Sequence, residues 1–294
     1  MPYTETLKSA EAIANRAARQ KQNLVANSAN DKRKVQKSLY KAARNGTSRE
    51  NLTQSEFDAH VPVGLLAIEN LPAFERLLAI PEDGLGAVDF EGVHGRKGSV
   101  EEGFYPMSAG VVGPNCEPLL TTAVNSAALF GKTGIEHVGK LYPGSTLDRH
   151  IKMARWMASK IAGGDDTTLL SDEDIDKFFE SAPTYEDFVS AYGDAVKPLD
   201  ALTHYHGPEY KFHSTVGCRT EMVDVFPIVV KFMQPACHGN RTVPLGLSSI
   251  WRMFYPDQAF PGKPHDATAD AIAVLLIARR LVELHRDQGT AWVE

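Results

Sequence analysis

Apolar and polar residues alternate along residues 85–93, LGAVDFEGV, with the period of two that is typical of a β-strand. We predict two more strands at residues 107–112 and 119–124, because the intervening GPNCEP has the composition of a turn. Residues 199–205 and 221–226 give weaker strand patterns. The predicted strands therefore begin at residue 85 and continue into the second half of the chain.

Apolar residues recur every three or four positions in other segments, which is the pattern of an amphipathic helix. The predicted helices are residues 72–80, 147–161, 172–181 with Ser171 as N-cap, 185–196, 245–254 and 266–285. The last has the clearest pattern, because Val274, Ile277, Leu281 and Leu284 follow Asp270 on one helical face. Strands that then alternate with helices predict an α/β fold.

The first 60 residues differ from the rest. Residues 5–45 are rich in Ala, Lys, Arg, Gln and Asn, which predicts one or two exposed helices, and residues 45–62 have the composition of a linker. We therefore predict a helical or partly disordered N-terminal arm at residues 1–60 and a folded domain at residues 61–294.

Charge is divided unevenly between these parts. Residues 1–50 contain 11 Lys and Arg but 4 Asp and Glu, a net charge of +7, whereas the remaining residues contain 20 basic and 33 acidic groups, a net charge of −13. A basic arm on an acidic domain indicates contact with a polyanion, and a solvated polar helix explains the same charges equally well.

Three cysteines cannot form a disulfide framework, so we expect an intracellular protein, cytoplasmic or nuclear, rather than a secreted one. We expect no membrane association, because no apolar run is long enough to span a bilayer. We also expect no structural zinc, because the spacing of the histidines and cysteines between residues 204 and 238 matches no standard zinc site. These residues are His204, His206, His213, Cys218, Cys237 and His238.

Two acids interrupt the first predicted strand. Asp89 and Glu91 are two residues apart, so their side chains project from the same face. Adjacent carboxylates repel, and burial increases the cost unless a partner neutralises them. A hard divalent cation such as Mg²⁺ would do so, whereas a strand end that emerges into water would need no partner.

A second candidate cluster precedes the last helix. Asp270 lies at the start of its apolar face, and His265 lies five residues earlier, in the loop or first turn after Pro264. An acid at this position needs a cation, a metal or the favourable field of the helix N-terminus.

These two motifs, Asp89-Phe90-Glu91-Gly92 and His265-x(4)-Asp270, resemble those of the DEDDh, or DnaQ-like, 3′–5′ exonucleases of the RNase H-like superfamily. The resemblance covers residues 83–286 and includes LGLSSI upstream of the histidine. It implies an RNase H-like mixed sheet flanked by helices, preceded here by the basic helical extension. Residues 146–182 would be an insertion between the motifs.

The family has a middle aspartate, five residues after a histidine at a strand end. Counting from His204 reaches Glu209, which we take as the ligand, with Asp200 and Asp224 as alternative donors. Other alignments place Tyr210 or Lys211 at this position, and a lysine there would indicate a damaged site.

The resemblance implies two Mg²⁺ or Mn²⁺ ions held by Asp89, Glu91, Glu209 and Asp270, with His265 as general base. The reaction would release nucleoside 5′-monophosphates from the 3′ end of single-stranded RNA or DNA. We lean to RNA. The alternative function is an exonuclease-like protein with a weakened site that binds nucleic acid or protein without cleavage.

Deletion of residues 1–50 is expected to weaken nucleic-acid binding and to reduce its salt dependence, because a net charge of +7 is removed. Fluorescence anisotropy with a labelled oligonucleotide over a series of salt concentrations measures both quantities. An unchanged slope of affinity against salt would show that the arm does not contact the phosphates.

Overall fold

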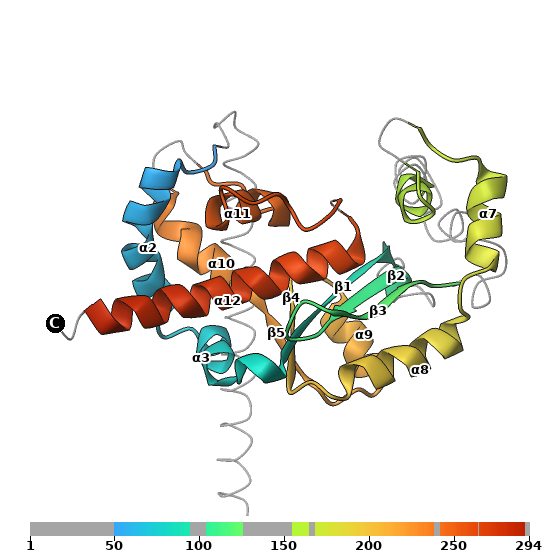
Figure 1. The fold of residues 1–294 in the computed structure, drawn as a ribbon, viewed down its shortest axis with the longest axis horizontal. Helices are drawn as coiled ribbons and strands as arrows, with labels where there is room; N and C mark the ends of the chain where they lie inside the picture. Colours follow the sequence, from blue (N-terminus) through green and yellow to red (C-terminus); the bar gives the residue numbers. More distant parts are fainter. Residues whose placement is uncertain are drawn as a thin grey trace, which may run out of the picture. The chain divides into compact units, whose positions relative to one another are not determined.

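The alternating segment LGAVDFEGVH forms β1 (Leu85–His94), the central strand of a five-stranded sheet (Figure 1). On one side it pairs with β2 (Phe104–Val112), which pairs in turn with β3 (Pro118–Ala123), and both pairings are antiparallel. On the other side it pairs with β4 (Ala201–His204), which pairs with β5 (Glu221–Asp224), and both pairings are parallel. The spatial order is therefore β3-β2-β1-β4-β5.

Helices flank this sheet, and the predicted α/β class is confirmed at that level. The computed structural model describes residues 50–94, 104–125, 155–164, 168–237, 242–263 and 265–291. The helices are α2 (Gln54–Ile68), α3 (Pro72–Ala79), α7 (Asp172–Glu180), α8 (Tyr185–Val196), α9 (Glu209–Thr215), α10 (Val225–Met233), α11 (Leu247–Phe254) and α12 (Ala267–Ala291), with short 3₁₀ turns at Glu82–Gly84 and Gln234–Ala236. Within the described residues, no helix combines the length and the apolar character that a membrane span requires.

The chain divides into two compact units. Residues 51–235 and 245–294 form the larger one, which contains the whole sheet, and residues 1–50 and 236–244 form the smaller one. The predicted helices in the basic arm lie outside the described residues.

The linker prediction is wrong from Gln54 onward, because α2 begins there. Thr53 caps the helix by accepting a hydrogen bond from the Glu56 backbone, and the Glu56 carboxylate accepts one from the Thr53 backbone in return. The helix continues through Pro62 and buries an apolar face that includes Phe57 and Ile68. The predicted boundary between residues 60 and 61 therefore falls inside a helix.

Two short helices were not predicted. The last strand ends at Asp224 rather than residue 226, because the Asp224 carboxylate accepts a hydrogen bond from the Phe226 N–H and starts α10. Pro227 is tolerated in the first turn, where its missing N–H has no helical partner to lose. The other, α9, has only seven residues after Pro208, too few for a clear helical pattern.

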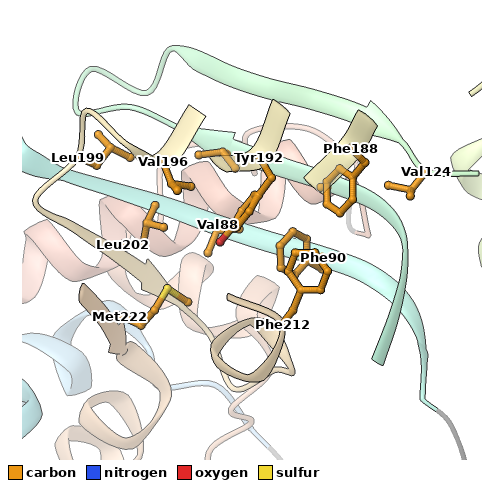
Figure 2. Close-up of a cluster of buried hydrophobic side chains, with 12 residues drawn as sticks. Val88, Phe90, Val124, Phe188, Tyr192, Val196, Leu199, Leu202, Phe212 and Met222 are labelled. Carbon is orange, nitrogen blue, oxygen red and sulfur yellow. The ribbon is translucent and has the colours of Figure 1, made fainter. Parts of the chain in front are cut away.

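One face of the sheet carries an aromatic core, shown in Figure 2. Phe90 projects from β1 toward α8 and α9, and its ring centroid lies 4.9 Å from that of Phe212 and 5.5 Å from that of Tyr192. Phe188 and Val88 complete the contact and are fully buried. The even-numbered side of β1 is therefore the apolar side, so Asp89 and Glu91 belong to the opposite face.

The opposite face is covered by α12, which crosses the strands in Figure 1. Its first turn lies directly on β2, where an added Cβ on Gly110 would be 2.4 Å from the Thr268 nitrogen and 2.5 Å from the Ala267 carbonyl carbon. Gly110 is the register partner of Asp89, so this close approach places the start of α12 beside the acidic segment of β1.

Gly110→Ala is expected to lower the free energy of unfolding by about 1–3 kcal/mol, because the new methyl group would clash with the α12 backbone. Gly193→Ala in α8 is the matched control, since its new methyl group would meet nothing within 4 Å and should stabilise the helix by about 0.5–1 kcal/mol. Urea unfolding of both variants measures the two effects. Equal changes in unfolding free energy for the two variants would show that the packing of α12 on β2 does not depend on Gly110.

Candidate metal centre

Asp89 and Glu91 extend from β1 beneath the start of α12. Asp89 is half-buried, and its Oδ2 atom is fully enclosed without a hydrogen-bond partner. Glu91 is only 8% exposed. A β-bulge between Glu91 and Gly92 shifts the register of the pairing with β2 immediately after the two acids, and the pairing then continues to His94. The strand therefore holds both carboxylates in the interior rather than releasing them into water.

The start of α12 contributes the next two groups. The Asp266 carboxylate accepts hydrogen bonds from the N–H groups of Thr268 and Ala269, at 3.0 and 3.1 Å, which caps the helix. Asp270 lies in the first turn, and its Oδ2 accepts a 3.3 Å hydrogen bond from the His265 N–H. This contact closes the loop onto the helix and brings the imidazole toward β1.

His265 links the two elements. Its Nδ1 lies 3.2 Å from Glu91 Oε1, and its φ of 66° is in the left-handed region that non-glycine residues rarely occupy. Glu91, His265 and Asp270 each offer one ligand atom, and these three atoms lie within 4.8 Å of one another. They are close enough to share one metal ion. The chain therefore brings together three of the five predicted site residues around one point.

Glu209 lies next to His204 of β4, the strand that pairs with β1 on the side away from β2. It opens α9, is 2% exposed, and its Oε2 atom lies 3.5 Å from Nδ1 of His204, which is 4% exposed. Neither of these two atoms has a hydrogen-bond partner. An added Cβ on Gly207 would be only 1.9 Å from Glu209 Oε2, so the longer glutamate side chain fits because residue 207 is a glycine.

The electrostatics of Asp89 show that these carboxylates converge. Burial raises the pKa of Asp89 well above its ordinary value, and the charges of Glu209, Glu91 and Asp270 raise it further. Burial followed by the Glu91 charge raises the pKa of Asp270 to about 7. The hydrogen bond to Glu91 raises the pKa of His265. The charges of Glu91, Glu209 and Asp270 thus act on the buried Asp89, and a divalent cation would relieve this repulsion.

The other candidates for the middle position lie elsewhere. The Asp200 carboxylate lies against Gly84 before β1, where an added Cβ would be 2.1 Å from its Oδ2. Asp224 caps α10 and also accepts a hydrogen bond from the His206 N–H. Lys211 is exposed on α9. Among these candidates, Glu209 is the carboxylate whose charge acts on Asp89.

The histidine- and cysteine-rich segment is dispersed. Both ring nitrogens of His213 are bonded, Nδ1 to the Tyr192 hydroxyl at 2.7 Å and Nε2 to the Thr220 carbonyl at 2.9 Å. Cys218 packs against the aromatic core, and His238 lies outside the described residues. The contacts of His213 and Cys218 are those of core residues.

Some residues at the centre were not predicted. Trp156 contacts His265 from a helical stretch at residues 155–161, within the segment predicted as an insertion, and no motif marks it. Gly110 and Gly207 allow the close approaches, but a glycine alone does not reveal what packs on it. Asp266 is an aspartate directly before the helical pattern, which is a residue type typical of a helix N-cap. Its capping role could therefore have been predicted from the sequence.

Comparison of the chain with protein-family models, with curated proteins and with solved structures finds no match.

In the metal-free protein, Asp270→Asn is expected to raise the melting temperature by an amount that grows from about pH 4 to about pH 7 and then levels off. The pKa of Asp270 is about 7 in the folded state, against 3.8 ordinarily, so the folded state keeps a proton that the unfolded chain loses. The contribution of Asp270 to folding stability therefore falls as the pH rises through that interval. Asparagine does not titrate, so the Asp270→Asn variant does not lose this stability.

Thermal unfolding in EDTA across this pH range measures the difference. Asp257→Asn, in an exposed loop, controls for the removal of one acidic charge. A stability gain from Asp270→Asn that does not change with pH would contradict the repulsion inferred for the centre.

Proposed function

We propose that this chain is a divalent-metal-dependent phosphodiester hydrolase that acts as a 3′–5′ exonuclease on RNA or DNA. The observation that carries the proposal is the convergence of Glu91, Glu209 and Asp270 on Asp89, whose enclosed Oδ2 atom has no partner. Within the described residues, no basic side chain is hydrogen-bonded to Asp89. Buried carboxylates without such a partner destabilise the fold, and a cation-binding role explains their presence.

The donor set fits Mg²⁺ or Mn²⁺, because these ions prefer carboxylate oxygen. Asp89, Glu91, Glu209 and Asp270 would hold the metal ions. When bound, such ions supply an activated water and neutralise charge on the leaving 3′-oxygen.

His265 is suited to accept a proton. Its Nδ1 atom faces the Glu91 carboxylate at 3.2 Å, so the favourable tautomer donates the Nδ1 proton to that oxygen. This leaves Nε2 without a proton and able to act as general base. The side chain is 53% exposed, which leaves room for a substrate and its attacking water to approach.

The sheet is consistent with the expected RNase H-like architecture. The strand that carries Asp89 and Glu91 is central, with antiparallel neighbours on one side and parallel neighbours on the other. The DEDDh resemblance supplies the exonuclease polarity and the 5′-monophosphate product, which geometry alone does not give.

A lysine in place of the middle ligand would support the alternative function, which is binding without cleavage. Lys211 is exposed, whereas Glu209 is buried and acts electrostatically on Asp89. The arrangement therefore favours the hydrolase over the alternative.

The purified chain is expected to shorten end-labelled single-stranded RNA or DNA from the 3′ end with Mg²⁺ or Mn²⁺ and not with EDTA. Asp89→Ala should reduce the rate by at least about 10³-fold, because it removes a ligand of the proposed metal site. A denaturing-gel ladder measures both, and parallel reactions on the two nucleic acids identify the preferred sugar.

Asp257→Asn is the control acid and should cleave at the wild-type rate. Metal-dependent cleavage that survives Asp89→Ala would contradict the proposed centre. Absence of cleavage on both nucleic acids with both metals, in a folded protein, would contradict the exonuclease function.

A further inference from the structure

Trp156 contacts the general-base candidate from outside the acidic cluster. Its indole and the imidazole of His265 have ring centroids 5.4 Å apart and planes at 80°, which is an edge-to-face contact. The two residues are more than one hundred positions apart, and Trp156 belongs to the helical stretch at residues 155–161. The helical stretch at residues 155–161 therefore reaches the candidate metal centre.

This stretch is anchored independently of His265. Ala158 and Ser159 are buried, and Ala158 packs with Met107 of β2 and with Ile175 and Phe179 of α7. The Ser159 hydroxyl oxygen accepts a 2.8 Å hydrogen bond from the Leu170 N–H. The helical stretch that carries Trp156 is thus anchored to a small core that includes Met107 of β2.

Strand β2 connects the core that anchors residues 155–161 to Glu91. Met107 precedes Ser108, which is the register partner of Glu91. The Lys160 ammonium group lies 5.2 Å from the centroid of the Trp156 ring and adds a cation–π contact to the indole. The orientation of Trp156 is therefore set by its own surroundings.

His265 needs such a support. Its backbone has a positive φ, its side chain is 53% exposed, and its hydrogen bond to Glu91 fixes one ring nitrogen while leaving the ring free to turn about that contact. An aromatic ring edge-to-face with the imidazole restricts this rotation. The direction in which Nε2 points then depends on Trp156.

We propose that Trp156 is a positioning residue for His265, so that the helical stretch at residues 155–161 completes the catalytic centre. This inference rests on the proposed function, since it assigns to His265 the role of general base. Trp156 holds the imidazole and takes no proton itself.

Trp156→Ala is expected to lower kcat by about 10–100-fold, the usual effect of losing a group that orients a catalytic residue, while KM and the Mn²⁺ affinity change less than about twofold. Trp156→Phe keeps an aromatic ring and should recover most of the loss. Phe178→Ala is the matched control, because Phe178 packs against the same small core without contacting His265, and it should lower the melting temperature but not kcat.

An activity-independent measurement examines the contact directly. The imidazole C–H resonances of His265, assigned with His265→Gln, should shift in Trp156→Ala because the indole ring current is lost, and they should not shift in Phe178→Ala. Unchanged His265 resonances would overturn the inference.

Different results would contradict the positioning role of Trp156 and the hydrolase activity. Full kcat in Trp156→Ala, or a loss no greater than that of Phe178→Ala, overturns the positioning role and leaves the hydrolase intact. An inactive wild-type protein overturns the hydrolase and, with it, the role of His265 as a base.

Discussion

The cost of burying several carboxylates around Asp89 is the constraint on which the centre depends. Removing one carboxylate from water is unfavourable, and each further negative charge nearby adds to that cost. The raised pKa values of Asp89 and Asp270 are direct consequences. Without a cation, either some of these carboxylates are protonated or the folded state is less stable. Such an arrangement is expected where stability is exchanged for a binding site.

Close backbone packing makes the cluster possible. α12 can lie on β2 only because Gly110 has no side chain, and this contact brings Asp270 to the Asp89 region. Gly207 does the same for Glu209, whose carboxylate occupies the space that a Cβ would take. A glutamate at this position is one methylene longer than the aspartate that the DEDDh resemblance implies, and the glycine accommodates it.

The two faces of β1 divide structural and chemical roles. Val88 and Phe90 point into an aromatic core with α8 and α9, which supplies much of the apolar burial. Asp89 and Glu91 point to the side covered by α12. Because successive residues of a strand alternate in direction, one ten-residue strand anchors the fold and presents the acids at once.

Elements with strong local patterns could be predicted from the amino-acid sequence alone. The alternation at residues 85–93 gave β1 and the faces of Asp89 and Glu91, and the apolar stripe after Asp270 gave α12, because periodicity is a local property of the chain. The short helix α9 and the start of α2 were missed, since seven residues carry little periodic signal and a capping box within a polar segment resembles a linker.

The contacts between groups that are distant in the chain could not be predicted from local patterns. The tertiary structure placed Glu209, rather than Asp200 or Asp224, where its charge acts on Asp89, and it brought Trp156 onto His265. No sequence pattern encodes these contacts, because they depend on strand pairing and on helix packing across glycines far away in the chain. Local periodicity thus determined which side chains share a face, and long-range packing decided which of those side chains share a site.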